Sequence, residues 1–156
     1  MTMPKLVKGG KNAFGWSKVN ESGKIVIPPD AYSEYNFYAT KYVYLLSGSK
    51  KSGGFGLTTL NLLKESYLSE IFHAHPELEN PGSIIGNPLQ HKSKTYCCVP
   101  ISSNTFTVPL NVLKLYGVKK DSLLLTVRGS YVALGFIVKG PIIEEAKRHP
   151  ELKVYQ

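Results

Sequence analysis

Short apolar runs separated by turn-forming residues predict a chain built mostly of β-strands. We expect strands over residues 15–19 and 24–27, joined into a hairpin by the polar tetrad Asn20-Glu21-Ser22-Gly23. A second hairpin is expected from strands over residues 42–46 and 55–60, on either side of the loop sequence SGSKKSGG. The first half of the chain therefore predicts two consecutive hairpins.

The second half of the chain predicts the same elements again, including a hairpin from strands over residues 123–127 and 131–138. At an offset of 81 residues the chain matches itself at several positions: Pro28 with Pro109, Tyr35 with Tyr116, Gly48-Ser49 with Gly129-Ser130, and Gly54-Phe55 with Gly135-Phe136. We predict two copies of one unit, over residues 12–79 and 95–156. The segment 80–94, rich in Gly, Pro, Asn and Lys, is predicted to be a linker.

A longer helix is expected near the end of each copy. Apolar residues recur at helical spacing over residues 60–71 and again over 142–146, and each pattern is followed by the sequence His-Pro-Glu-Leu. Because proline cannot continue a helix, the HPEL sequences at 75–78 and 149–152 are interpreted as helix ends.

Each copy also contains a strand that stops at a proline. Pro28 and Pro109 have no N–H and hold φ near roughly −65°, so a strand is expected to end there and a short helix to begin. The two short helices are expected to close at Asn36 and Gly117, because Asn and Gly tolerate the left-handed conformation best.

Composition adds a preference for anionic partners. The chain has 156 residues, of which 42% are hydrophobic and 19% charged, and a formal net charge of +8. These values indicate a globular protein whose first expected partner is nucleic acid. No apolar run is long enough for a membrane span and the N-terminus lacks the apolar core of a signal peptide, so a cytoplasmic protein with no membrane partner is expected.

Residues 16–28, WSKVNESGKIVIP, resemble the opening of the AbrB/MazE/SpoVT family of DNA-binding domains. The family pattern is a basic pair, Val, a polar turn, then Gly-Arg, two hydrophobic residues and Ile-Pro. The resemblance covers about 45 residues of each copy and leaves the C-terminal helices outside it. In the second copy, YGVKKD at residues 116–121 is closer to the pattern than the first copy is.

The resemblance implies a mainly β fold, a swapped-hairpin barrel that in the family forms from two chains. Two copies in one chain imply a single-chain pseudo-dimer, in which the second copy covers the sheet edges of the first. We expect a monomer in solution, with the helix of each copy packed on the outside of the barrel.

The resemblance also implies contacts with duplex DNA. The family's basic positions fall on Ser17, Lys18, Lys24, Tyr32 and Ser33 in the first copy, and on Cys98, Val99, Thr105, Leu113 and Lys114 in the second. Of these, Lys18, Lys24 and Lys114 are basic. Lys50, Lys51 and Arg128, which lie in matching hairpin loops, are further candidates for phosphate contacts.

The predicted function is therefore a DNA-binding transcriptional regulator with an asymmetric basic face. The alternative is a barrel that no longer binds DNA and serves as a small-ligand-binding or protein-interaction module. The basic net charge favours the first function, and the loss of most of the family's basic positions favours the second.

Other chemistry is weakly indicated. The sequence has no phosphate-binding loop, nucleophile elbow or evident carboxylate pair, so neither an enzyme nor a cofactor is predicted. His73 and His75 face away from each other on a helix, and no metal site is predicted.

Cys97 and Cys98 are adjacent, so on a strand they point to opposite faces. Core packing is the expected role of the tyrosines between residues 32 and 44, with stacking on single-stranded nucleic acid as the alternative.

Overall fold

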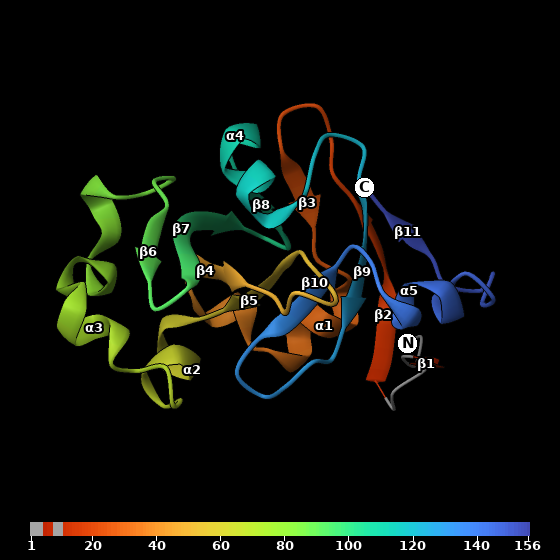
Figure 1. The fold of residues 1–156 in the computed structure, drawn as a ribbon, viewed down its shortest axis with the longest axis horizontal. Coiled ribbons are helices and arrows are strands. Elements are labelled where there is room, and N and C mark those ends of the chain that lie inside the picture. Colours follow the sequence, from red (N-terminus) through yellow and green to blue (C-terminus); the bar gives the residue numbers. More distant parts are fainter. Residues whose placement is uncertain (1–4, 8–10) are drawn as a thin grey trace.

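The computed structural model describes residues 5–7 and 11–156, which form one mainly β fold. Nine strands follow one another in the hydrogen-bonded order β1-β2-β9-β10-β5-β4-β7-β8-β3 and curve into a nearly closed barrel (Figure 1). Two short strands attach to it, β11 beside β2 and β6 beside β7. The mainly β fold class predicted from the sequence is confirmed.

The elements are short throughout. The strands are β1 (Lys5–Val7), β2 (Lys11–Lys18), β3 (Lys24–Val26), β4 (Tyr42–Ser47), β5 (Phe55–Thr58), β6 (Leu89–His91), β7 (Lys94–Ser102), β8 (Thr105–Thr107), β9 (Leu123–Val127), β10 (Leu134–Ile137) and β11 (Val154–Tyr155). The α-helices are α1 (Pro29–Glu34), α2 (Leu60–Lys64), α3 (Ile71–Ala74), α4 (Leu110–Leu113) and α5 (Pro141–Ala146). The 3-10 helices are η1 (Phe37–Ala39), η2 (Pro76–Glu79), η3 (Pro81–Ser83) and η4 (Lys114–Tyr116). None of these helices is long and apolar enough to cross a membrane.

Strands from the two halves of the chain pair with one another. β2 lies antiparallel to β9, and β4 lies antiparallel to β7. The two halves also meet at the ladders β3–β8 and β5–β10. The hairpins β4–β5 and β9–β10 form as expected. The hairpin expected from residues 15–19 and 24–27 keeps its turn, which is closed by a bond from the Asn20 N–H to the Lys24 carbonyl, but β2 pairs with β9 and β3 with β8 in place of each other. Because each half supplies pairing partners to the other, neither half completes its own sheet.

Residues that lie 81 positions apart face each other where the halves meet. Ile25 is the register partner of Phe106, and Phe55 is the partner of Phe136. All four side chains are buried in the main core. The Phe55 ring stacks on Phe136 with their centroids 5.1 Å apart, and contacts Phe106 and Tyr116 edge to face. The interior of the barrel is thus built jointly by both halves.

The predicted change from strand to helix at proline is confirmed in both halves. Pro28 caps α1 and Pro109 caps α4, each directly after a strand. Asn36 follows α1 with φ at 57°, and Gly117 follows η4 with φ at 75°, so both have the left-handed conformation that was expected. The chain then enters β4 in one half and β9 in the other.

Helices cover two outer faces of the barrel. The cluster on β4 and β7, which includes Tyr44, Tyr96 and Cys98, is covered by α2, α3 and η2 through Leu63, Ile71 and Leu78. The cluster on β2, β9 and β10 is covered by α5 through Ile143 and Ala146. Cys97 belongs to the inner core and Cys98 to the outer cluster, as their adjacent positions predicted.

The prediction of a single helix over residues 60–71 is wrong. α2 stops at Lys64, and a turn separates it from α3. The hydroxyl of Ser66 donates to the carbonyl of Leu63 and accepts from the N–H of Leu68, and such local bonds compete with helix continuation. Tyr67, which the helical spacing placed on the apolar face, is 80% exposed.

The repeated HPEL sequence forms the same turn twice. The Nδ1 atom of His75 lies 3.1 Å from a Glu77 carboxylate oxygen, and that of His149 lies 2.9 Å from Glu151. In each copy the leucine N–H donates to the histidine carbonyl, which directs Leu78 and Leu152 toward the two outer clusters. The first HPEL follows α3 directly, whereas α5 ends at Ala146, a few residues before the second.

The predicted linker, residues 80–94, has more regular structure than expected. It contains η3 and the strand β6, and β6 forms a hairpin with β7 through Lys92 and Ser93. Both turn residues have positive φ, which matches the twist of a tight hairpin.

Candidate nucleic-acid interface

The turn between β2 and β3 is fixed by Asn20 and Gly23. The side-chain oxygen of Asn20 accepts hydrogen bonds from the backbone N–H groups of Ser22 and Lys24. Gly23 has φ at 88°, and a Cβ there would lie 2.1 Å from the carbonyl oxygen of Val108. Only glycine fits this close approach, which presses the hairpin against the start of α4.

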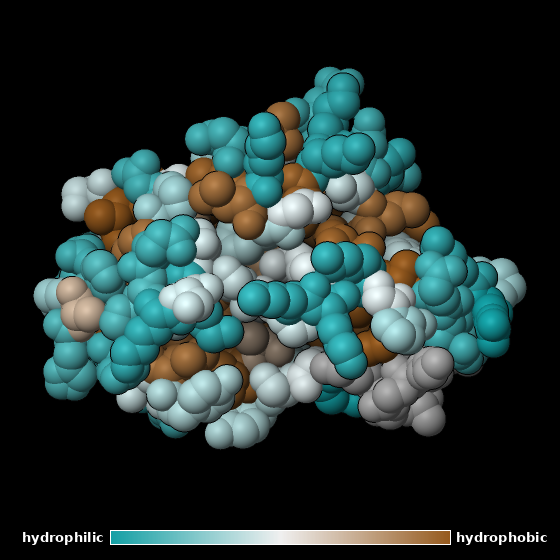
Figure 2. All heavy atoms as spheres, in the orientation of Figure 1, coloured by the Kyte–Doolittle hydropathy of each residue, from teal (hydrophilic) through white to brown (hydrophobic). Residues whose placement is uncertain are grey.

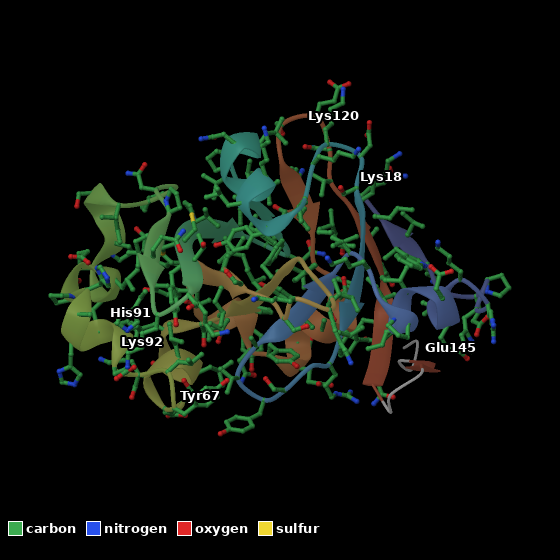
Figure 3. All side chains as sticks on the ribbon, viewed as in Figure 1. Lys18, Tyr67, His91, Lys92, Lys120 and Glu145 are labelled. Carbon is green, nitrogen blue, oxygen red and sulfur yellow. The ribbon has the colours of Figure 1, made fainter. Side chains whose placement is uncertain are left out.

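Two of the predicted DNA contacts, Lys18 and Lys24, flank this turn. Lys18 is the register partner of Leu123, and the loop before β9 is held to the hairpin by backbone bonds between Val19 and residues Asp121 and Ser122, at 2.9 and 3.0 Å. This loop carries Lys119 and Lys120, both exposed. In Figure 3, Lys18 and Lys120 lie at the same end of the molecule.

A third predicted contact, Lys114, lies on η4, directly after α4. The first residue of α4, Leu110, approaches Gly23 closely, so this helical segment begins against the same hairpin. We call the hairpin turn with Lys18 and Lys24, the loop with Lys119 and Lys120, and η4 with Lys114 the basic end. Figure 2 shows hydrophilic residues over the tip of the β2–β3 turn and a mixture of hydrophilic and hydrophobic ones near α4. Leu110 of α4 and Leu115 of η4 are exposed.

The lysines of the basic end are free of ion pairs. No salt bridge to any of the five lysines is formed within the described residues. Glu21 in the hairpin turn and Asp121 in the adjoining loop are the carboxylates of these segments. Five positive charges against two negative ones leave an excess that faces solvent, as phosphate recognition requires.

The equivalent end of the other half lacks this charge. There the hairpin β7–β8, η1 and α1 take the corresponding places. The N–H of Ile101, one residue after the counterpart of Val19, donates to the carbonyl of Lys41, the counterpart of Ser122. At the offset of 81 residues, the five lysines correspond to Val99, Thr105, Ser33, Tyr38 and Ala39. Lys41 is the cation of this end, and α1 carries Asp30 and Glu34.

Several of the family's basic positions are buried in this chain. Ser17 lies inside the barrel, where its hydroxyl donates to the carbonyl of Val26 and contacts the Thr126 hydroxyl at 3.0 Å. Cys98, Val99 and Leu113 are also buried. These positions are therefore closed to DNA, one in the first half and three in the second.

The remaining predicted contacts lie on two other segments, of which one adjoins η4. Lys50 and Lys51 are exposed on the β4–β5 loop, which is bonded to Tyr116 through the N–H of Gly54 and approaches Gly140 before α5. Arg128 follows β9, about 16 Å along the strand from Leu123 at the usual rise per residue. The backbone pairing thus places Lys18 and Lys24 beside the loop with Lys119 and Lys120, whereas Lys50 and Lys51 lie on a loop that is bonded to η4, and Arg128 lies at the other end of β9.

Arg128 is engaged within the protein. Its Nε and Nη2 atoms donate to the two carboxylate oxygens of Glu34 at 2.5 and 2.6 Å, and its guanidinium lies 5.4 Å from the centre of the Phe14 ring. The hydrogen bond to Glu34 raises the pKa of Arg128. The pair joins α1 of the first half to β9 of the second.

Lys119 and Lys120 are not among the predicted contacts, which come from the family's basic positions and from the matching hairpin loops. The signal for them in the sequence is the segment YGVKKD, which resembles the family pattern. Their position beside Lys18 depends on the pairing of β2 with β9, which the sequence did not specify.

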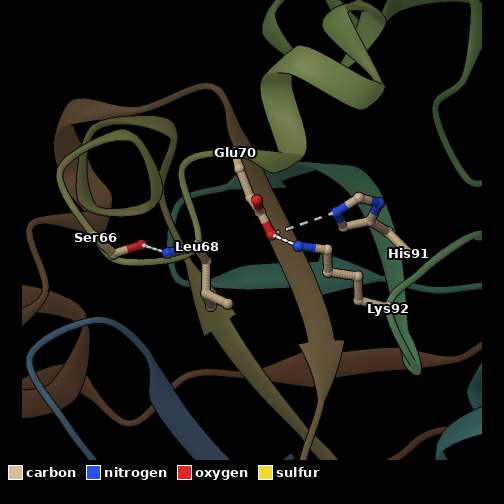
Figure 4. A network of polar contacts seen from close by, with 5 residues as sticks. All are labelled: Ser66, Leu68, Glu70, His91 and Lys92. Carbon is tan, nitrogen blue, oxygen red and sulfur yellow. Dashed lines mark hydrogen bonds and ion pairs between the residues drawn. The ribbon is translucent and has the colours of Figure 1, made fainter.

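A polar cluster far from the basic end holds the β6–β7 turn to the segment before α3 (Figure 4). Lys92 donates to the carboxylate of Glu70, and His91 Nε2 lies 3.9 Å from the same carboxylate. Hydrogen bonding to Lys92 lowers the pKa of Glu70. Within the described residues, no group of three or more His, Cys, Asp or Glu side chains is arranged to hold a metal ion.

Comparison with known proteins adds no assignment. No protein-family model, no curated protein and no solved structure matches this chain.

Proposed function

We propose that the protein binds duplex DNA through its basic end and acts as a transcriptional regulator of the AbrB/SpoVT type. The observation that carries this proposal is the pairing of β2 with β9, which holds Lys18 and Lys24 beside the loop with Lys119 and Lys120, just after Lys114 in the chain; none of these lysines forms an ion pair among the described residues. Mobile ammonium groups that are not paired internally are available to neutralise phosphates.

The proposal includes the architecture of the family, a swapped-hairpin barrel formed by two tandem copies. The pairing of β2 with β9 and of β4 with β7 supports it, since each copy's first strand joins the other copy's second hairpin. The register Ile25–Phe106 and Phe55–Phe136 also supports it, because a two-fold axis brings equivalent residues of the two copies opposite each other. One chain then acts as a pseudo-dimer.

Recognition would be electrostatic and one-sided. The five lysines are point charges that contact phosphates, and the described part of the basic end has no arginine to form bidentate contacts with guanine. The affinity should therefore depend strongly on salt and weakly on sequence.

A salt titration tests the proposal. We expect the full chain to bind a fluorescently labelled duplex in an anisotropy assay, with log K falling linearly against log salt at a slope of about −4.5 if all five lysines contact phosphates. Absence of binding at low salt, or binding that does not change with salt, would contradict DNA binding through the basic end.

A further inference from the structure

A hollow of about 440 Å³ opens between the two halves of the chain, apart from the basic end. It is bounded by the end of α1, by α2 and by the loop after β9. Its lining residues are Glu34, Tyr35, Asn36, Leu62, Arg128, Gly129, Ser130 and Tyr131. A volume of this size is sufficient for a small organic molecule.

The ion pair Glu34–Arg128 forms one wall and leaves the hollow without net charge. Arg128 uses Nε and Nη2 for its two bonds to Glu34, and within the described residues Nη1 has no hydrogen-bond partner. An anionic ligand would have to displace Glu34 from the guanidinium. A neutral ligand with an acceptor atom can take a hydrogen bond from Nη1 and leave the pair intact.

Aromatic and apolar groups form the other walls. Tyr131 is 75% exposed, so its ring is free to stack on a planar ligand. Tyr35 is buried, and its hydroxyl donates to the carbonyl of Ser130 at 2.7 Å, which fixes the loop. The side-chain oxygen of Asn36 accepts from the Tyr38 hydroxyl, which leaves the Asn36 amide hydrogens as donors.

The side chains that give this hollow its chemistry are found in one half of the chain only. At the offset of 81 residues, Tyr35 and Gly129-Ser130 recur as Tyr116 and Gly48-Ser49, which are residues that shape the same turns. The groups that give the hollow its chemistry do not recur: Glu34 corresponds to Leu115, Arg128 to Ser47 and Tyr131 to Lys50. Two halves with the same framework thus differ at the side chains that would contact a ligand.

We propose that this hollow binds a neutral, planar heteroaromatic molecule of the nucleobase or nucleoside type. The ring stacks on Tyr131, and a ring nitrogen or carbonyl accepts a hydrogen bond from Nη1 of Arg128. The Glu34–Arg128 pair selects against a phosphate on the ligand. This binding is additional to DNA binding and does not depend on it.

The test is an NMR titration of the full chain with guanosine, adenosine, cytidine and uridine, observed through backbone amides. We expect at least one nucleoside to shift the amides of Asn36, Gly129 and Ser130, with a dissociation constant on the order of 0.1 mM for a ligand of this size. Tyr131→Ala should weaken binding by about tenfold or more. Tyr67→Ala removes an equally exposed tyrosine outside the hollow and should change the affinity by less than about twofold.

A second variant tests the role of the ion pair. In the wild-type chain, the nucleoside that binds should do so at least as well as its own 5′-monophosphate, whereas Glu34→Gln frees the guanidinium and should make the monophosphate the tighter ligand. The proposal is overturned if no nucleoside shifts these amides, if Tyr131→Ala binds like the wild type, or if the wild-type chain prefers the monophosphate.

Discussion

The β2–β3 turn and the turn of the β7–β8 hairpin lie at opposite ends of the ladder between β3 and β8, and the segments around them are alike. Each is bonded to a loop of the other half, and each is followed by a proline and a short helix. Their solvent-facing residues differ: five lysines surround the first hairpin, and their counterparts are Val99, Thr105, Ser33, Tyr38 and Ala39. The two halves of the chain therefore share a backbone framework and differ in the residues that face solvent.

Packing explains why the interior stays alike while the surface differs. Ile25, Phe55, Phe106 and Phe136 fill the space where the halves meet, and a change in any of them is felt by both halves. A lysine on a hairpin turn contacts solvent, so its replacement costs the fold little. The effect of such a replacement is expected on the binding of a ligand that contacts the lysine.

The largest expected effect concerns the shared interior. Phe55→Ala and Phe136→Ala should each lower the free energy of unfolding by about 3–5 kcal/mol, because each removes a buried ring from the same stack. Urea denaturation should show one transition in both variants, with similar losses. Tyr67→Ala, at an exposed position, serves as the control and should change stability by less than about 0.5 kcal/mol. Two separate transitions, or a loss in only one variant, would contradict a jointly built interior.

The two cysteines test whether both faces of β7 are covered. Burial raises the pKa of Cys97 to about 11 and that of Cys98 to about 12. Neither thiol should react with a thiol reagent at neutral pH until the chain unfolds, when both should react.

The same pKa shifts predict a dependence of stability on pH. The folded state keeps both thiol protons in a range where the unfolded chain has begun to lose them, so their contribution is complete below the ordinary thiol pKa and is lost as pH rises toward 11. Urea midpoints measured from pH 8 to pH 11 should fall for this reason, and Cys97→Ala should fall less steeply. Rapid reaction of either thiol with the reagent in the folded protein would show that the face of β7 that carries it is exposed to solvent.

A smaller effect is expected from adding lysines to the equivalent end of the other half, around the β7–β8 hairpin. Tyr38→Lys combined with Ala39→Lys places lysines at the counterparts of Lys119 and Lys120. If both hairpins then reach one duplex, the salt slope should steepen by about 1.8 and the affinity should rise several-fold. Tyr67→Lys combined with Ser69→Lys adds the same charge elsewhere and is the matched control. Equal gains from both variants would indicate a general charge effect.

Local chemistry in the sequence predicted much of the fold. Prolines 28 and 109 ended strands and began helices, Asn36 and Gly117 closed them, and the adjacent cysteines took opposite faces. Each of these outcomes depends on the residue itself and its immediate neighbours. The prediction of one helix over residues 60–71 was wrong because the hydroxyl of Ser66 forms hydrogen bonds with the backbone of Leu63 and Leu68, which compete with the helical ones.

The candidate site was less predictable because it depends on contacts between distant segments. Lys18 and Lys24 could be chosen from one stretch of sequence, but Lys119 and Lys120 join them only through the pairing of β2 with β9. Arg128 was chosen for its charge, and the carboxylate that holds it lies 94 residues earlier in the chain. The strands β6 and β11 are too short to give a periodic signal.

The most direct test of the one-sided interface compares two double charge reversals in the anisotropy assay. Lys18→Glu with Lys24→Glu alters the basic end, and Lys50→Glu with Lys51→Glu makes the same change in net charge on a separate exposed loop. With folding verified by circular dichroism, the first pair should weaken binding to duplex DNA by about 50-fold or more and the second by less than about threefold. Equal losses from the two pairs, or no loss from the first, would contradict an interface at the basic end.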